Sequence, residues 1–321
     1  MKRRTFVQQG TGVAGGLALL PFFSGCSKSS DQDYPIIDTH QHLWDSRFKL
    51  TWPGPPIDTG DFMLPEYRAE VEGLNFVKSV YMEVGVPKEY RRDEAFFALD
   101  LAEDSSNNTV GAIICADPSE DNFRKFISEF VKNTHLKGVR GRLSDPDVFN
   151  SGGVTDNLRW LGEQGLSFDL IVRPDWLTKV VPQFEKCPET TIIIDHCASV
   201  DPVALLPENV EKPREPRHSK EIWQNGIRAL AENENVNCKI SGIVNKVHGE
   251  DVNAELLGPC VNYCLDAFGP DHVVFASDWP VCLYGASIRA WVTVLKEIVK
   301  DRPMDEQKKL FHDNARRIYK V

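Results

Sequence analysis

The segment Ile36-Ile37-Asp38-Thr39-His40-Gln41-His42 begins with apolar residues and ends with two histidines that are separated by one residue. In an extended strand, residues i and i+2 point to the same face. We therefore expect His40 and His42 to project together from the end of a buried strand. Two neighbouring imidazoles can hold a metal ion or polarise a carbonyl group.

Two more polar side chains end apolar strands much later in the chain. His196 follows the run Thr191-Ile192-Ile193-Ile194-Asp195, and Asp278 follows Val273-Val274-Phe275-Ala276-Ser277. The carboxyl ends of parallel strands meet at one edge of a sheet or barrel. The four groups His40, His42, His196 and Asp278 therefore predict one catalytic or metal-binding site.

Short apolar runs alternate with segments of helical period along the rest of the chain. We expect strands at residues 36–42, 75–84, 110–117, 136–142, 166–172, 190–196, 236–242 and 272–278. We expect helices near 88–104, 119–132, 154–164, 175–185, 219–233, 254–267, 285–299 and 305–319. Eight strands that alternate with eight helices predict an α/β fold, a single-domain (β/α)8 TIM barrel over residues 34–321. A doubly wound open sheet is the alternative, but no GxGxxG follows the first strand.

The first 33 residues have the pattern of an export signal and a tether. Lys2-Arg3-Arg4-Thr5-Phe6-Val7 matches a twin-arginine pattern, and a Gly-rich apolar stretch follows up to Leu20. Residues 1–25 are predicted to be a signal peptide and residues 26–33 a tether that begins with a lipidated Cys26. The protein would then be a periplasmic or cell-envelope lipoprotein that meets the membrane only through Cys26. An ordinary cleaved signal with an incidental cysteine is the alternative.

Charge and cysteine content exclude two classes of protein. Removal of residues 1–25 takes away three positive charges and no negative one, so the formal net charge changes from −10 to −13. Nucleic-acid binding depends on phosphate neutralisation by Lys and Arg, so no nucleic-acid partner is expected. The seven remaining cysteines are odd in number and lack CxxC spacing, so they predict small buried side chains and not a disulfide framework.

Strand alternation selects further inward-facing candidates. It offers Glu83 on the second strand, Arg140 and Arg142 on the fourth, and Lys239 and Ser241 on the seventh. Arg140, Glu83 and Lys239 are candidate substrate contacts. A buried Lys239–Glu83 ion pair and purely structural arginines are the alternatives.

Two long connections follow strands that end in candidate site residues, and we interpret residues 43–65 and 199–218 as substrate walls. Trp44, in the first of them, and Trp279, next to Asp278, are further candidate substrate contacts. The same alternation predicts that Asp38 faces inward at a deeper level and that Asp195 points the other way.

This constellation suits hydrolysis. A carboxylate such as Asp278 can take a proton from water while imidazoles, with or without a metal, polarise the electrophile. Three His and one Asp would also suit a single Zn²⁺, which lowers the pKa of its bound water to about 7.

The chain resembles the amidohydrolase superfamily, in the amidohydrolase-2 type subgroup of lactone hydrolases that includes L-fuconolactonase-like and pyrone-dicarboxylate lactonase-like enzymes. The resemblance runs from residue 36 to the final helix. It is carried by Asp38-Thr39-His40-Gln41-His42-Leu43-Trp44-Asp45, Gly165-Leu166-Ser167-Phe168-Asp169-Leu170, Asp195-His196-Cys197, Lys239-Ile240-Ser241-Gly242, Phe268-Gly269-Pro270-Asp271 and Ser277-Asp278-Trp279-Pro280-Val281-Cys282. It implies that His40, His42 and His196 surround the substrate carbonyl or a metal, with Asp278 as the base.

The chain departs from the binuclear members of the superfamily, which use a carbamylated lysine on strand four and a histidine on strand five. Here strand four presents Arg140 and Arg142, and strand five has no histidine. Arginine stays protonated and is not a metal ligand, so a binuclear centre is not expected. The resemblance leaves open one divalent cation, such as Zn²⁺, or no metal.

The function that the resemblance implies is hydrolysis of a lactone, in particular a sugar-acid lactone, with a small-molecule lactone or sugar acid as the partner. The alternatives are a metal-dependent non-oxidative decarboxylase of the amidohydrolase-2 type and a non-catalytic lipoprotein that binds a sugar acid.

Overall fold

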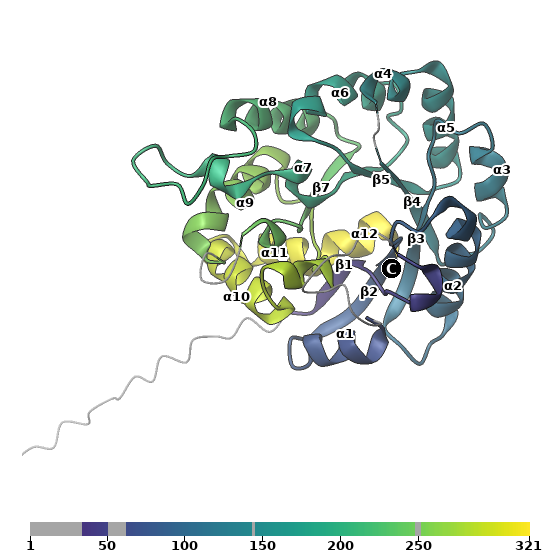
Figure 1. Ribbon diagram of the computed structural model, residues 1–321, viewed down its shortest axis with the longest axis horizontal. Coiled ribbons are helices and arrows are strands. Elements are labelled where there is room, and N and C mark those ends of the chain that lie inside the picture. Colours follow the sequence, from purple (N-terminus) through teal and green to yellow (C-terminus); the bar gives the residue numbers. More distant parts are fainter. Residues whose placement is uncertain (1–33, 51–61, 143–144, 248–251) are drawn as a thin grey trace, which may run out of the picture. The chain divides into compact units, whose positions relative to one another are not determined.

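Eight parallel strands form a sheet in which each strand pairs with its neighbour in sequence, and helices surround it (Figure 1). The computed structural model describes residues 34–50, 62–142, 145–247 and 252–321, of which Tyr34–Val321 make up one compact unit. The strands are β1 (Ile36–Gln41), β2 (Phe76–Met82), β3 (Thr109–Cys115), β4 (Leu136–Arg142), β5 (Ser167–Ile171), β6 (Ile192–Ile194), β7 (Val236–Ile240) and β8 (Val273–Phe275). The predicted signal peptide and tether lie outside the described residues.

The sheet closes on itself between its last and first strands. Just beyond β8, Trp279 forms a parallel bridge with Gln41. The Asp278 amide donates to the carbonyl of His40 at 3.1 Å, and the His42 amide donates to the carbonyl of Trp279 at 2.8 Å. The prediction of a barrel is therefore confirmed, and the open doubly wound sheet is wrong.

Helices follow the strands, and most of them form the outer layer of the barrel (Figure 1). They are α1 (Leu64–Val71), α2 (Arg91–Glu103), α3 (Phe123–Ser128), α4 (Pro146–Phe149), α5 (Gly152–Glu163), α6 (Leu177–Glu185), α7 (His196–Ser199), α8 (Lys220–Ala231), α9 (Ala254–Phe268), α10 (Ile288–Val299), α11 (Met304–Lys308) and α12 (Asn314–Tyr319). Each predicted helix is present within a few residues, and the closing one is divided by a π-helical turn at Lys309–Asp313. The sequence did not predict α1, because Tyr67 is its one buried residue and no apolar period marks it.

α10 shows why these segments become outer helices. Ser287 caps its first turn, and its hydroxyl accepts a hydrogen bond from the amide of Ala290 at 3.2 Å. The buried residues follow at helical spacing on one face, and they are Ile288, Trp291, Val292, Leu295 and Val299. No helix of the described ranges is long and apolar enough to cross a membrane.

Part of the barrel interior is apolar. Val80 and Met82 of β2 pack there with Ile113 of β3, Ile193 of β6 and Val274 of β8, together with Ile318 and Tyr319 of α12. The Tyr319 hydroxyl donates to the Asp169 carboxylate of β5 at 3.0 Å. Because these side chains fill the interior, the polar groups gather around the carboxyl ends of the strands.

Candidate active site

The two strands that lead to His196 and Asp278 are shorter than predicted. β6 ends at Ile194 and β8 ends at Phe275, and both His196 and Asp278 have a left-handed backbone with φ of 59°. A left-handed residue cannot continue a strand, so each chain turns where its polar side chain begins. The predicted strands 190–196 and 272–278 were therefore too long at their carboxyl ends.

The structure brings the four principal candidates together around one carboxylate oxygen. Asp278 Oδ1 lies 3.6 Å from His40 Nε2, 3.6 Å from His42 Nε2 and 3.9 Å from His196 Nε2. The other oxygen, Oδ2, accepts a hydrogen bond from the Asn245 side chain at 3.3 Å. Asn245 lies in the connection after β7, and no motif in the sequence marked it.

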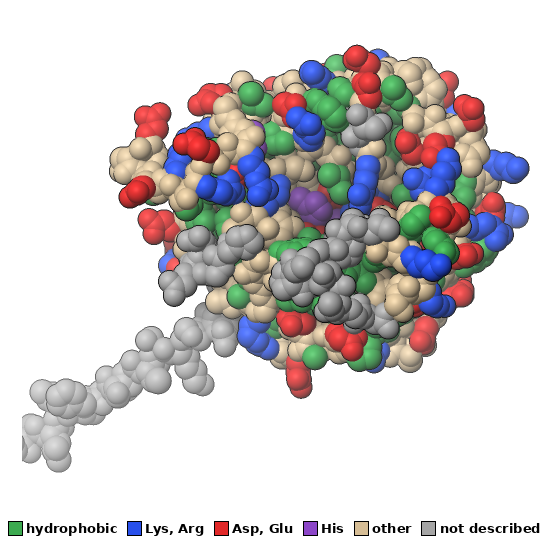
Figure 2. Space-filling model, viewed as in Figure 1, with side chains coloured by type: hydrophobic (Ala, Val, Ile, Leu, Met, Phe, Trp, Pro, Cys, Tyr) green, Lys and Arg blue, Asp and Glu red, His purple; other side chains and the backbone are tan. Residues whose placement is uncertain are grey.

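Figure 2 shows a histidine side chain (purple) in a hollow near the centre of the face that it depicts, with Lys and Arg side chains (blue) on two sides. Positive charge thus lies close to this hollow, although the whole chain has a formal net charge of −10.

The His40 and His42 rings show that this cluster fits one cation. His42 Nδ1 lies 3.0 Å from the carbonyl of Met82, which can only accept, so His42 Nε2 carries the lone pair. His40 Nε2 lies 3.1 Å from that atom and 3.2 Å from Arg140 Nη1, which can only donate. With the His40 proton on Nδ1, next to the Asp195 carboxylate, the two imidazole lone pairs face each other, an arrangement that a shared cation would stabilise.

The distances agree with this interpretation. Ligand atoms of a tetrahedral ion with bonds of 2.0–2.1 Å stand about 3.3 Å apart. The separations among His40 Nε2, His42 Nε2 and Asp278 Oδ1 are 3.1, 3.6 and 3.6 Å. Within the described ranges, two imidazoles and one carboxylate thus have the donor types and spacing for one divalent ion.

Arg140 is held rigidly beside the histidines by Glu83. Its Nε donates to Glu83 Oε1 at 2.5 Å, and Nη2 donates to the Glu83 backbone carbonyl at 2.6 Å. Burial opposes ionisation of Glu83, but the charges of Arg140 and Arg142 hold the pKa of that carboxyl below its ordinary value. Arg140 therefore keeps a fixed positive charge 3.2 Å from His40.

Glu83 does not reach the site in the way that strand alternation predicted. Val80 and Met82 occupy the inward positions of β2, and Glu83 lies just beyond the end of that strand. Its Oε1 accepts from Arg140 and its Oε2 from the amide of Gly85 at 2.7 Å. Glu83 thus orients Arg140 and is not itself placed as a substrate contact.

Lys239 lies on the opposite side of His40 from Arg140. Its Nζ is 3.0 Å from Asp195 Oδ1, 3.4 Å from Asp169 Oδ2 and 3.3 Å from His40 Nδ1. The predicted alternative of a Lys239–Glu83 ion pair is wrong. Glu83 pairs with Arg140, and Lys239 pairs with Asp195 and Asp169. Lys239 is completely buried next to His40, and its charge is balanced there by the two aspartates.

Asp195 points into the barrel, although the sequence predicted that it points the other way. Its carboxylate lies between Lys239, His40 and Arg140, with Oδ1 3.6 Å from His40 Nδ1 and Oδ2 4.0 Å from Arg140 Nη1. The inward residue of β6 is Ile193 and not Ile194. A run of three isoleucines shows no alternation, so the phase of this strand could not be determined from sequence.

Asp38 is a second correction. β1 has an irregular register against β2 between Asp38 and Gln41, which changes the phase of the strand before the histidines. The Asp38 carboxylate accepts from the Tyr67 hydroxyl of the outer helix α1 at 2.9 Å and from the Ser277 amide at 2.9 Å. Asp38 therefore does not face inward with His40 but supports the segment that carries Asp278.

His196 is positioned by a turn that the sequence did not predict. The four residues His196–Ser199, labelled α7, all have positive φ. His196 Nδ1 lies 2.9 Å from the Ser241 hydroxyl. A Cβ atom on Gly242 would lie 2.4 Å from His196 Cγ, and Gly242 itself has φ of 62°, so glycine is required beside the imidazole.

The two tryptophans contact apolar residues. Trp279 is completely buried, and its ring packs against Phe62 at 5.7 Å and Tyr67 at 5.4 Å between centroids. The structure therefore does not bring Trp279 into the site, because the chain turns at Asp278. The Trp44 ring packs on Phe62 at 5.3 Å. Residues 51–61 of the predicted wall 43–65 lie outside the described residues, and the roles of both walls stay predictions.

Burial sets the protonation of the cluster. It lowers the pKa of His40 well below its ordinary value, with the Lys239 charge acting in the same direction. Burial and the Arg140 charge lower the pKa of His42 to about 3, and burial lowers that of His196. Burial raises the pKa of Asp278 to about 6. At neutral pH the three imidazoles are neutral and Asp278 is mostly ionised, which is the state that a base or a metal site requires.

The chain is similar to known proteins along most of its length. A family model for amidohydrolases matches residues 37–321. The uncharacterized protein y4mH of Sinorhizobium fredii is 27% identical over 313 residues, covering 90% of this chain and 99% of its own. The L-fucono-1,5-lactonase of Burkholderia multivorans is 26% identical over 298 residues, covering 88% of this chain and 95% of its own.

A solved structure has the same fold. The crystal structure of an amidohydrolase from Burkholderia multivorans with bound zinc superimposes with a TM-score of 0.76 at 23% sequence identity, and the match covers 90% of this chain and 100% of that one.

The Asp195 position leads to a prediction about stability. Asp195→Asn would leave Lys239 and Arg140 with less compensation inside the barrel, and removal of one partner from a buried pair costs about 3–5 kcal/mol. We expect the free energy of unfolding in denaturant to fall by this amount. The control is Asp175→Asn, which breaks a solvent-exposed pair with Arg173 at 3.0 Å and should cost less than about 1 kcal/mol. Equal midpoints of denaturant unfolding for Asp195→Asn and Asp175→Asn would contradict the role given to Asp195.

Proposed function

The chain belongs to the amidohydrolase family, and we propose that it hydrolyses a lactone, in particular the cyclic ester of a sugar acid, with Asp278 as the general base. The observation that carries this proposal is the position of Asp278 Oδ1 within 3.6–3.9 Å of three neutral imidazoles. The similarity to an L-fucono-1,5-lactonase along nearly the whole chain supports a lactone as the substrate.

The side chains suggest an order of events. Asp278 takes a proton from water, and the resulting hydroxide attacks the lactone carbonyl carbon. The carbonyl oxygen becomes negatively charged and is stabilised by positive charge in the site. The ring C–O bond then breaks, and the leaving oxygen takes the proton back from Asp278. The product is an open-chain hydroxy acid.

Asp278 has suitable properties for this role. Burial raises its pKa to about 6, so it is a stronger base than an exposed aspartate and is still mostly ionised at pH 7. Asn245 donates to Oδ2 and leaves Oδ1 facing the imidazoles. Arg140, whose orientation is set by Glu83, supplies a permanent positive charge for the oxyanion.

We further propose that His40, His42, Asp278 and His196 hold one divalent cation such as Zn²⁺. When bound, such an ion polarises the carbonyl and lowers the pKa of its water to about 7. The zinc in the Burkholderia multivorans amidohydrolase structure supports this choice. Ligation through His40 Nε2 would require that atom to give up its contact with Arg140, which retains its bonds to Glu83.

The reaction is tested with a panel of aldonolactones, and acid release is followed with a pH indicator. The wild-type mature chain should hydrolyse at least one lactone, and Asp278→Asn should lower kcat by about 10²–10⁴-fold because the general base is lost. Asp100→Asn, an exposed aspartate on α2, is the control and should keep wild-type activity. If no lactone is turned over and a carboxylated aromatic releases CO₂ instead, the enzyme is a decarboxylase and the proposal is wrong.

The metal is tested by elemental analysis of the purified protein. We expect about one divalent ion per chain, because His40, His42, His196 and Asp278 converge on one site. His42→Ala should lose the ion, whereas His312→Ala, whose Nδ1 pairs with Asp313 away from the cluster, should keep it. Chelation should abolish turnover, and readdition of the ion should restore it. A fully active protein with no metal would refute this part.

For location, we propose export by the twin-arginine route and anchoring through Cys26, supported by Arg3, Arg4 and the apolar stretch that ends at Cys26. Cys26→Ser should move the protein from the membrane fraction to the aqueous fraction without changing its turnover. Replacement of Arg3 and Arg4 by Lys should retain it in the cytoplasm. A Cys26→Ser protein that remains in the membrane fraction after normal cleavage would exclude the lipid anchor.

A further inference from the structure

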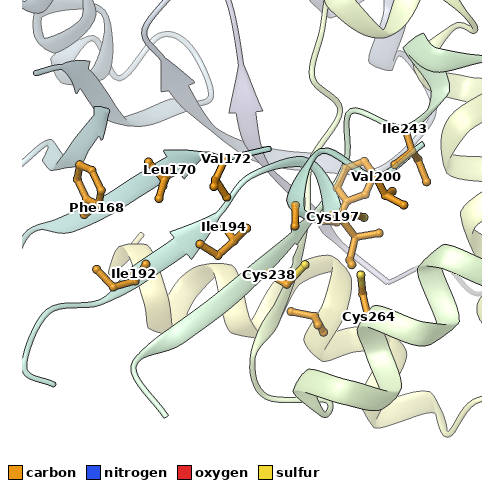
Figure 3. Close-up of a cluster of buried hydrophobic side chains, with 14 of the residues drawn as sticks. Phe168, Leu170, Val172, Ile192, Ile194, Cys197, Val200, Cys238, Ile243 and Cys264 are labelled. Carbon is orange, nitrogen blue, oxygen red and sulfur yellow. The ribbon is translucent and has the colours of Figure 1, made fainter. Parts of the chain in front are cut away.

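Three cysteine thiols that are far apart in sequence meet behind the candidate active site. Cys197 lies in the turn α7 after β6, Cys238 lies on β7 and Cys264 on α9. Their sulfur atoms all lie within 4.8 Å of one another, and none is in a disulfide. Figure 3 shows the three side chains extending toward one another from these three elements.

The surroundings of this cysteine cluster are dry and apolar. The three cysteines have no exposed surface, and Ile194, Val200 and Ile243 lie close by in the same hydrophobic core (Figure 3). The Cys238 and Cys264 sulfurs both lie within 4.8 Å of the Cys197 sulfur. Packing alone requires small apolar side chains here but does not require three sulfur atoms to face a common point.

The spacing is close to that of a metal site. Three sulfurs bound in a plane to one ion at about 2.3 Å lie about 4.0 Å from one another. The cluster would therefore have to contract by less than about 1 Å to surround an ion. Side-chain rotations and small backbone shifts are sufficient for such a change.

We propose that Cys197, Cys238 and Cys264 bind one soft monovalent cation, Cu⁺. Thiolate ligands select Cu⁺ and Zn²⁺ among the common transition ions. Structural Zn²⁺ prefers four ligands, and the described ranges provide three here.

This site is separate from the candidate active site but lies directly behind it. Cys197 follows His196, and the turn that they share is held by a hydrogen bond from Trp223 Nε1 to the Cys197 carbonyl at 2.9 Å. Lys246 Nζ donates to the Ser199 carbonyl at 2.8 Å. An ion on Cys197 would tie this left-handed turn to β7 and α9, and we expect it to raise the melting temperature of the protein.

The proposal is tested by anaerobic titration of the reduced, purified mature chain with Cu⁺ in competition with the chromophoric chelator bicinchoninate. Each point is left until the absorbance stops changing, because the cluster has no exposed atom. We expect one tightly bound Cu⁺ per chain and an affinity more than about 100-fold lower in Cys264→Ala. Cys187→Ala removes a buried cysteine outside the cluster and should bind like the wild type.

X-ray absorption of the wild-type Cu⁺ complex gives a test that does not depend on the folding of a variant. Three sulfur neighbours at about 2.3 Å are expected. Nitrogen neighbours would place the ion on the histidines and overturn the proposal. It is also overturned if the wild type takes no Cu⁺ from the chelator, or if Cys187→Ala loses as much affinity as Cys264→Ala. In those cases the three thiols only fill space in the core.

Discussion

The Asp195 carboxylate lies between two positively charged side chains inside the barrel. Lys239 Nζ lies 3.0 Å from one of its oxygens, and Arg140 Nη1 lies 4.0 Å from the other. His40 lies between these cations, with one ring nitrogen near each of them. Burial opposes ionisation of Asp195, but the Lys239 charge and His40 hold its pKa well below the ordinary value. Without this carboxylate, Lys239 could not remain beside His40 at low cost.

The buried charges explain why the site can hold a base or a cation. Glu83 offsets Arg140, and Asp195 offsets Lys239, so these four groups sum to zero. The imidazoles are neutral because burial lowers their pKa values. Among the described residues, Asp278 forms no ion pair with Arg or Lys, and its negative charge is stabilised by a hydrogen bond from Asn245 and by the nearby Arg140. Such a carboxylate can accept a proton, and it also provides the negative charge that a divalent ion requires.

Much of the site could be predicted from sequence because it depends on one rule, that parallel strands end at a common edge. His40, His42, His196 and Asp278 follow apolar runs and do meet around one oxygen. Side-chain direction was predicted less well, because it depends on the phase of each strand. The three isoleucines of β6 hide that phase, and the irregular register of β1 changes it. The alternation of side chains along a strand therefore does not tell which way the residues beyond either feature point.

The remaining differences come from backbone that leaves the strand conformation at functional residues. His196 and Asp278 both have φ of 59°, a conformation that costs an L-residue of the order of 1 kcal/mol or more. The strain is compensated by contacts distant in sequence. Gly242 makes room for the His196 ring, and Asp38 holds the Ser277 amide just before Asp278. The Gly242 support depends on the pairing of β6 with β7, and the Asp38 support depends on closure of the barrel between β8 and β1. The geometry of the candidate site is therefore a consequence of strand pairing and barrel closure together, and no single strand or motif could have specified it.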